Sequence, residues 1–244
     1  MLCFQVQRVY MKSLLFGLAR CYLCQNYHAD KMLGLCSLCY DDLPWAIHAC
    51  RSCSEPIPKS CTDICGACIQ QPPPITRMVC ATWYQFPIKE MIHQFKFNSI
   101  QSNALLLGTL LSDKVESGYI HDSKPQVLLA VPIAINRLKK RGFNQADLIA
   151  KRLGKTLDIP VYLSLIKKTK ETAIQHSLNQ KERMQNLKNA FTINKHSWKH
   201  VALIDDVVTT NSTMLTLARL LRKSGVERVD AWSIAKTPKI KDFS

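Results

Sequence analysis

Two adjacent carboxylates followed by small hydroxyl residues form the stretch of this chain best suited to chemistry. Asp205 and Asp206 follow an apolar run, Val201 to Ile204, which predicts a buried parallel strand. A helix should begin after the hydroxyls, because the apolar residues from Met214 to Leu221 share one stripe and Gly225 stands where a helix ends. The free amides of that helix start suit a phosphate, and the acids suit ribose hydroxyls or Mg²⁺. The candidate residues are Asp205, Asp206, Val207, Val208, Thr209, Thr210, Asn211, Ser212 and Thr213.

A second anion site is predicted from four closely spaced cations. They follow the apolar strand expected at Pro125 to Pro132 and precede a helix expected from about Ala146, with Asn144 as its N-cap and Gly154 after it. Cations at the carboxyl end of a strand, before a helix N-terminus, favour an anion beside the first site. These cations are Arg137, Lys139, Lys140 and Arg141.

Eight cysteines form four Cys-x-x-Cys pairs near the N-terminus. They are Cys21, Cys24, Cys36, Cys39, Cys50, Cys53, Cys65 and Cys68, and adding 29 to the first four numbers gives the last four. Each copy offers four thiolates, enough for one structural Zn²⁺, so we expect one or two zinc ions. The spacing leaves open whether the ligand sets are sequential or interleaved. A disulfide scaffold or a redox pair is the alternative interpretation.

These candidates fall into two regions, which predict the domain organisation. We expect an extension at 1–17, a double zinc module at 18–71, a Pro-rich linker at 72–78 and an α/β domain at 79–244. In the α/β domain, a strand over Val79 to Phe86 leads into a helix that starts near Pro87, and Lys96 stands near the end of that helix. A further helix is expected from Leu105 to Val115, closed by Gly118.

The chain is strongly basic, and the positive charge is concentrated in its second part. The net charge is +15, and residues 137–188 hold 13 basic and 4 acidic side chains. Such clustering favours a polyanionic partner, either nucleic acid or a phosphorylated small molecule, although a solvated basic face is the simpler alternative. No apolar run is long enough for a membrane span and no secretory signal is recognised, so we expect a cytoplasmic protein without a membrane span.

The stretch from Val201 to Thr213 resembles the signature of type I phosphoribosyltransferases, which bind phosphoribosyl pyrophosphate (PRPP) with Mg²⁺. The resemblance implies a mainly parallel sheet flanked by helices. It also implies that one loop holds the 5′-phosphate and that the four cations hold the diphosphate. The chain departs from the signature at Asn211, where the family usually has glycine. Asparagine is the next most tolerant residue of a left-handed backbone.

Arg141 to Gln145 (Arg-Gly-Phe-Asn-Gln), together with the paired cysteines, is similar to the ComF/GntX family, which is tied to natural transformation and the use of external DNA. The resemblance covers about residues 18–236 and includes a polar segment that corresponds to the hood of phosphoribosyltransferases. The hood is either a site of base or DNA contacts or a surface loop. Lys96 either faces the PRPP pocket or only complements its helix dipole. The candidate contacts are Lys96, Gln175, Arg183, Asn186 and Lys188.

Three hypotheses follow from these patterns. The first is a competence protein that handles incoming single-stranded DNA on the cytosolic side, binds PRPP, and docks a partner such as the translocation helicase. The second is a metabolic phosphoribosyltransferase that acts on a nucleobase. The third is a PRPP-sensing regulator, in which the ligand changes the affinity for DNA or protein.

Overall fold

The computed structural model describes residues 19–28, 34–60, 63–97, 101–168 and 190–239. The chain divides into two compact units, Met1–Pro44 and Trp45–Ser244. The second cysteine set therefore lies in the same unit as the sheet, whereas the sequence placed the domain boundary at 72–78. Among the described residues, no helix combines the length and the apolar character that crossing a bilayer would require.

The 29-residue repeat of the cysteines is also present in the backbone. The amide of Cys21 donates to the carbonyl of Asn26 at 2.8 Å, and the amide of Cys50 donates to that of Glu55 at 2.8 Å. Each copy then forms a short helix with its third cysteine as N-cap. The elements of the two copies are β1 (Ala19–Arg20), β2 (Tyr27–His28) and α2 (Ser37–Asp41) in the first, and α3 (Gly66–Gln70) in the second. The two copies therefore share one local fold.

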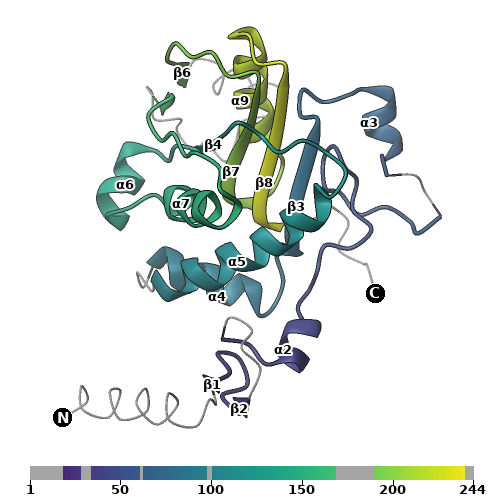
Figure 1. Ribbon diagram of the computed structural model, residues 1–244, viewed down its shortest axis with the longest axis vertical. Coiled ribbons are helices and arrows are strands. Elements are labelled where there is room, and N and C mark those ends of the chain that lie inside the picture. Colours follow the sequence, from purple (N-terminus) through teal and green to yellow (C-terminus); the bar gives the residue numbers. More distant parts are fainter. Residues whose placement is uncertain (1–18, 29–33, 61–62, 98–100, 169–189, 240–244) are drawn as a thin grey trace, which may run out of the picture. The chain divides into compact units, whose positions relative to one another are not determined.

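The larger unit is built on a four-stranded parallel sheet, as the apolar strands predicted. The strands are β3 (Arg77–Trp83), β4 (Val127–Ala130), β7 (His200–Val208) and β8 (Arg228–Lys236). They lie side by side in the order β3-β8-β7-β4, and every neighbouring pair is parallel (Figure 1). Nearly all of their residues are buried, which is typical of a parallel sheet covered on both faces.

Helices cover both faces of this sheet. The helices are α4 (Ile88–Phe97), α5 (Gln101–Gly118), α7 (Gln145–Leu157) and α9 (Ser212–Lys223). The stripe of α9, from Met214 to Leu221, packs in one core cluster with alternate strand residues such as Leu129 and Leu203. Helices α5 and α7 contact each other and also pack against the strands. The residues between these alternate positions, such as Leu128 and Trp232, are fully buried as well.

Two local expectations were wrong. Residues 135–141, expected as a loop of cations, form the helix α6 (Ile135–Arg141), which ends at Gly142 in the left-handed conformation (φ 78°). Helix α7 was expected to end before Gly154 but runs on to Leu157. A Cβ on Gly154 would lie 2.4 Å from Val161 Cγ2 and 2.7 Å from the carbonyl oxygen of Ile159. This glycine therefore allows a close approach within the fold and does not end the helix.

A polar network holds the amino ends of the strands. Asp122, which follows α5, accepts hydrogen bonds at 2.7 and 2.8 Å from the guanidinium of Arg228 and one at 3.1 Å from Arg77. The hydrogen bonds from Arg228 hold the pKa of Asp122 below its ordinary range. Asp230 is fully buried and accepts a hydrogen bond from the Tyr119 hydroxyl at 2.6 Å. This network lies at the end of the sheet opposite to Asp205 and Asp206.

Strands β5 (Ile166–Lys168) and β6 (Phe191–Ile193) pair with each other to form a small antiparallel ribbon. Ile166 and Phe191 of this ribbon pack in the hydrophobic core cluster of the sheet. The chain between these strands, 169–189, is outside the described residues. The hood candidates Gln175, Arg183, Asn186 and Lys188 fall in that segment, so their roles stay predictions.

Candidate functional site

The acid pair lies near the carboxyl end of β7, where the sheet opens into a cavity. Because side chains alternate along a strand, the two aspartates leave β7 in different directions. Asp206 is buried, and one of its carboxylate oxygens lies 2.8 Å from the ammonium of Lys96 in the last turn of α4. Lys96 thus faces the acid pair, and its contact with PRPP stays a prediction.

Burial, with the charge of Asp206 beside it, raises the pKa of Asp205 to about 8. Lys96 acts in the opposite direction but does not offset these effects. Asp205 therefore holds a proton near neutral pH in the ligand-free protein. A cation or a hydroxyl donor placed in the cavity would favour its ionised form.

The turn after β7 forms a small cradle at the start of α9. Asn211 adopts the left-handed conformation (φ 61°, ψ −2°), and its carbonyl accepts a hydrogen bond from the amide of Leu215 at 2.8 Å. The first amides of a helix lack intrahelical acceptors and carry the positive end of its dipole. Residues 207–214, with Asp205, enclose about 50 Å³, which is room for one small anion. The cradle is therefore suited to a phosphate group.

A larger cavity of about 320 Å³ adjoins the acid pair. Of the four predicted cations, Arg137 and Arg141 line it, whereas Lys139 and Lys140 do not. In a helix, residues four apart share one face, so the helical form of α6 lets both arginines reach the cavity. Both lysines are exposed. The cavity is lined by Tyr84, Lys96, Val131, Pro132, Ile133, Ala134, Arg137, Arg141, Asn144, Gln145, Ala146, Lys168, Asp205, Asp206, Val207, Thr209 and Thr213.

Sequence reasoning missed some of these residues. Tyr84 follows strand β3, and Lys168 is the last residue of strand β5. No local sequence pattern marks either residue as part of a site. Gln145 lies within reach of Arg141, whose guanidinium donates to the Gln145 side-chain carbonyl at 3.1 Å. Its place in the Arg-Gly-Phe-Asn-Gln motif was the signal that could have identified it.

The eight paired cysteines form two sequential clusters. In each, the sulfur atoms all lie within 4.8 Å of one another. Measured pairs are 3.8 Å apart (Cys24 and Cys36) and 3.7 Å apart (Cys53 and Cys65). Four sulfurs at about 2.3 Å from a tetrahedral zinc ion would be separated by roughly 3.8 Å. The donor sets and their spacing therefore fit structural zinc, and the sequential arrangement replaces the open alternative. The clusters are Cys21, Cys24, Cys36 and Cys39, and Cys50, Cys53, Cys65 and Cys68.

The second cluster is also supported by hydrogen bonds. The Cys65 amide donates to Cys50 Sγ at 3.3 Å. A hydrogen bond from Cys53 lowers the pKa of the Cys50 thiol, and the same contact raises the pKa of the Cys53 thiol. A cysteine held as thiolate is the form that binds a metal. Four thiolates leave no open coordination position, so the chemistry such an ion would supply is stabilisation of the fold.

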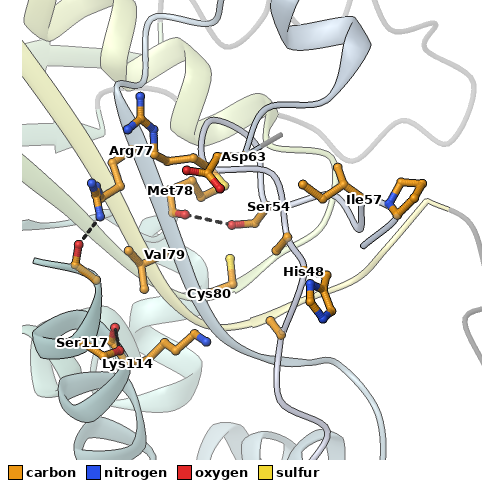
Figure 2. Close-up of a pocket in the computed structure, with 15 residues that line it drawn as sticks. His48, Ser54, Ile57, Asp63, Arg77, Met78, Val79, Cys80, Lys114 and Ser117 are labelled. Atoms are coloured by element: carbon orange, nitrogen blue, oxygen red, sulfur yellow. Dashed lines mark hydrogen bonds between the residues drawn. The ribbon is translucent and has the colours of Figure 1, made fainter. Parts of the chain in front are cut away.

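A second cavity, of about 430 Å³, lies beside the amino end of β3 (Figure 2). Ser54 donates to the carbonyl of Met78 at 3.1 Å, and Arg77 donates to the carbonyl of Gly118 (Figure 2). Burial lowers the pKa of Lys114, which also lines this cavity. None of the candidate site residues predicted from the sequence lines it, so the cavity at the acid pair is the better candidate site.

Comparison with curated proteins gives close relatives over nearly the whole chain, although no protein-family model matches it. Competence protein F of Haemophilus influenzae is 36% identical over 224 residues, which are 89% of this chain and 96% of that protein. DNA utilization protein YhgH of Escherichia coli is 34% identical with the same coverage. Competence protein ComFC of Bacillus subtilis is 28% identical over 84% of this chain and 78% of its own length.

Among solved structures, a purine phosphoribosyltransferase from Pyrococcus horikoshii covers 57% of this chain and 88% of its own, with 17% identity and a TM-score of 0.33.

Proposed function

Because this chain belongs to the ComF/GntX family, we propose that it serves the use of external DNA by handling single-stranded DNA while its α/β domain binds PRPP. The names of its relatives, competence protein F and DNA utilization protein YhgH, support the first part. The second part rests on the cavity beside Asp205 and Asp206.

One observation carries PRPP binding: the phosphate cradle and the cavity lined by Arg137 and Arg141 share Asp205. A 5′-phosphate would occupy the cradle at the start of α9. The ribose hydroxyls would donate to Asp205 and Asp206, and the diphosphate would meet Arg137 and Arg141. A Mg²⁺ ion that arrives with PRPP would neutralise part of the diphosphate charge.

The pair of Lys96 and Asp206 has a role in this arrangement. In the ligand-free protein the ammonium neutralises the buried carboxylate, which would otherwise lie unpaired in the cavity. When ribose hydroxyls donate to Asp206, Lys96 becomes available for the ligand's own phosphate oxygens. Loss of Lys96 should therefore weaken PRPP binding without altering the cradle.

Helix α6, which carries the two arginines, also offers cations for DNA. Lys139 and Lys140 are exposed and are not part of the cavity lining, so they can contact a DNA backbone while PRPP is bound. We assign the two arginines to PRPP and the two lysines to DNA. This division gives a test in which each double variant is the control for the other.

The test is isothermal titration with PRPP and Mg²⁺, alongside fluorescence anisotropy with a labelled oligothymidylate. Arg137→Ala/Arg141→Ala should weaken PRPP binding at least about tenfold, because charge-assisted hydrogen bonds contribute about 1.5–3 kcal/mol each. Lys139→Ala/Lys140→Ala should leave PRPP binding unchanged. It should reduce the slope of log Kd for DNA against log salt by about 1.4, since each phosphate contact contributes about 0.7.

Absence of PRPP binding to the wild-type protein would remove the ligand assignment. DNA affinity that does not change with salt would remove the DNA assignment. If each double variant weakened PRPP binding and DNA binding to the same extent, the assignment of the arginines to PRPP and the lysines to DNA would be wrong.

A phosphoribosyltransferase reaction is the second candidate. The cavity would hold the ribose between the phosphate cradle and the two arginines, where a nucleobase could displace the diphosphate. This candidate requires release of diphosphate from PRPP in the presence of a nucleobase. A panel of bases that releases none would eliminate it while leaving PRPP binding intact.

A further inference from the structure

The phosphate cradle is tied directly to the second cysteine cluster. The side-chain amide of Asn211, at the centre of the cradle, donates to the backbone carbonyl of Cys53 at 3.0 Å. Cys53 is a member of the second cluster. Glycine, which the family signature usually has here, could adopt the same backbone but could not make this bond. The link is therefore a property of the asparagine in this chain.

A buried lysine makes a second tie. Lys236, the last residue of β8, has a fully buried side chain whose ammonium lies 2.8 Å from a carboxylate oxygen of Glu55. The same ammonium donates to the carbonyl of Thr209 at 2.7 Å and to that of Thr237 at 2.8 Å. The ammonium therefore has two carbonyl acceptors and one ion-pair partner, the carboxylate of Glu55. A buried charge without such partners would be costly, which fixes the geometry of all three.

Both ties reach the same turn of the cysteine module. Glu55 is two residues after Cys53, and its carbonyl accepts the amide of Cys50. Binding of a metal by Cys50 and Cys53 would fix this turn. This turn contacts the cradle at two points. Asn211 donates directly to Cys53, and Lys236 links Glu55 to the carbonyl of Thr209.

We propose that the second cysteine cluster holds the phosphate cradle in its binding conformation, with Asn211 and Lys236 as positioning residues, so that metal binding and phosphate binding are coupled. This inference rests on the proposed function, in which the cradle takes the 5′-phosphate of PRPP. Coupling between two sites is reciprocal: a metal that favours the phosphate-binding conformation is itself retained more tightly when the phosphate is bound.

The decisive experiment measures, at equilibrium, how zinc divides between the full-length protein and a chromophoric chelator, with and without PRPP and Mg²⁺. A coupling of about 1–3 kcal/mol corresponds to about 5–150-fold, so PRPP should raise the affinity for one of the two zinc ions at least about fivefold. In Asn211→Gly, which keeps the left-handed backbone but lacks the amide, the effect should fall below about twofold. An equal gain in zinc affinity in both proteins, or an equal gain for both zinc ions, would overturn the proposal.

A second readout does not depend on PRPP. Hydrogen exchange of the amides of residues 207–213 should accelerate in Cys65→Ser, which loses a ligand of the second cluster but keeps Cys53 and Glu55. The control for the loss of one zinc ion is Cys24→Ser in the first cluster, where exchange in 207–213 should not change. Asn211→Gly should accelerate exchange in the same peptide.

These readouts separate the two proposals. If the wild-type protein does not bind PRPP, the proposed function fails, and hydrogen exchange alone decides whether the cluster supports the cradle. If PRPP binds but exchange in 207–213 is unchanged in Asn211→Gly, the coupling fails and the proposed function stands. Should Cys65→Ser not fold, Lys236→Met with Asn211→Gly supplies the same comparison on protein with both clusters intact.

Discussion

Removing the negative charge at Asp205 should stabilise the ligand-free protein, and the gain should depend on pH. The pKa of this carboxyl is raised to about 8 by burial and by Asp206. An aspartate in an unfolded chain titrates near pH 4. Between these values the folded state binds a proton that the unfolded state releases, so the stability of the wild-type protein falls as pH rises from about 4 to 8. Asp205→Asn cannot ionise and escapes this loss.

The magnitude follows from the interval between the two pKa values. One pH unit corresponds to about 1.4 kcal/mol, so an interval of about four units sets an upper limit of about 5 kcal/mol. Asp205 is partly exposed, and solvent and the nearby Lys96 reduce this value. We expect Asp205→Asn to raise the free energy of unfolding by about 2–3 kcal/mol at pH 8 and by less than about 1 kcal/mol at pH 5.

The assay is urea denaturation of wild type and Asp205→Asn at a series of pH values between 5 and 8, without PRPP. Mutations that improve stability at a binding site are expected to cost function, so the same variant should bind PRPP more weakly. A variant that is no more stable than wild type at pH 8, or equally more stable at every pH, would show that Asp205 does not carry a raised pKa and would refute the reasoning.

The remaining predictions address the fold and the metal. Asp122→Asn should show the opposite pH dependence to Asp205→Asn. The pKa of Asp122 is lowered, so the variant should be about 1–3 kcal/mol less stable than wild type at pH 7, and in a urea series extended to acid pH this difference should begin to shrink as pH falls below about 4. Gly154→Ala should lower the free energy of unfolding by about 1–3 kcal/mol, seen as a lower melting temperature, because its Cβ would lie 2.7 Å from a backbone oxygen. Gly66→Ala, with nothing within 4 Å of its Cβ, is the control and should not destabilise the protein. Metal analysis should find two zinc ions per full-length chain and one per chain of Cys65→Ser. Loss of both zinc ions, or of neither, in this variant would show that the two clusters do not bind zinc independently.

The parallel sheet and the acid pair could be predicted from sequence because their signals are local. Val201 to Ile204 is an apolar run of the kind that both faces of a buried strand require, and β7 contains it. The spacing of 29 residues between cysteine pairs likewise predicted two equivalent folds. In each case the physical cause lies within one element or one repeat.

Helix α6 could not be predicted in this way. None of its residues is buried, so it has no apolar stripe and therefore no hydrophobic period to detect. As a result, the sequence grouped four cations, of which Arg137 and Arg141 line the cavity and the two lysines do not. Gly154 was misinterpreted for a related reason, since its neighbour Val161 comes from a later segment.

Lys236 shows a further limit. The residues of β8 are apolar or small around it, and a lysine at the end of such a strand would usually reach solvent. Its acceptors come from residues 55, 209 and 237. Only a tertiary structure brings these three groups to one ammonium.

The repeat of 29 residues describes a duplication whose two products have diverged in their surroundings. The first copy closes within its own compact unit, whereas the second shares a core with the sheet through Ala46 and a charged contact through Glu55. Substitutions in the first copy are limited mainly by its own cysteines. In the second copy, a change at Glu55 requires a matching change at the end of β8, so these two positions should vary together among descendants of the same ancestor.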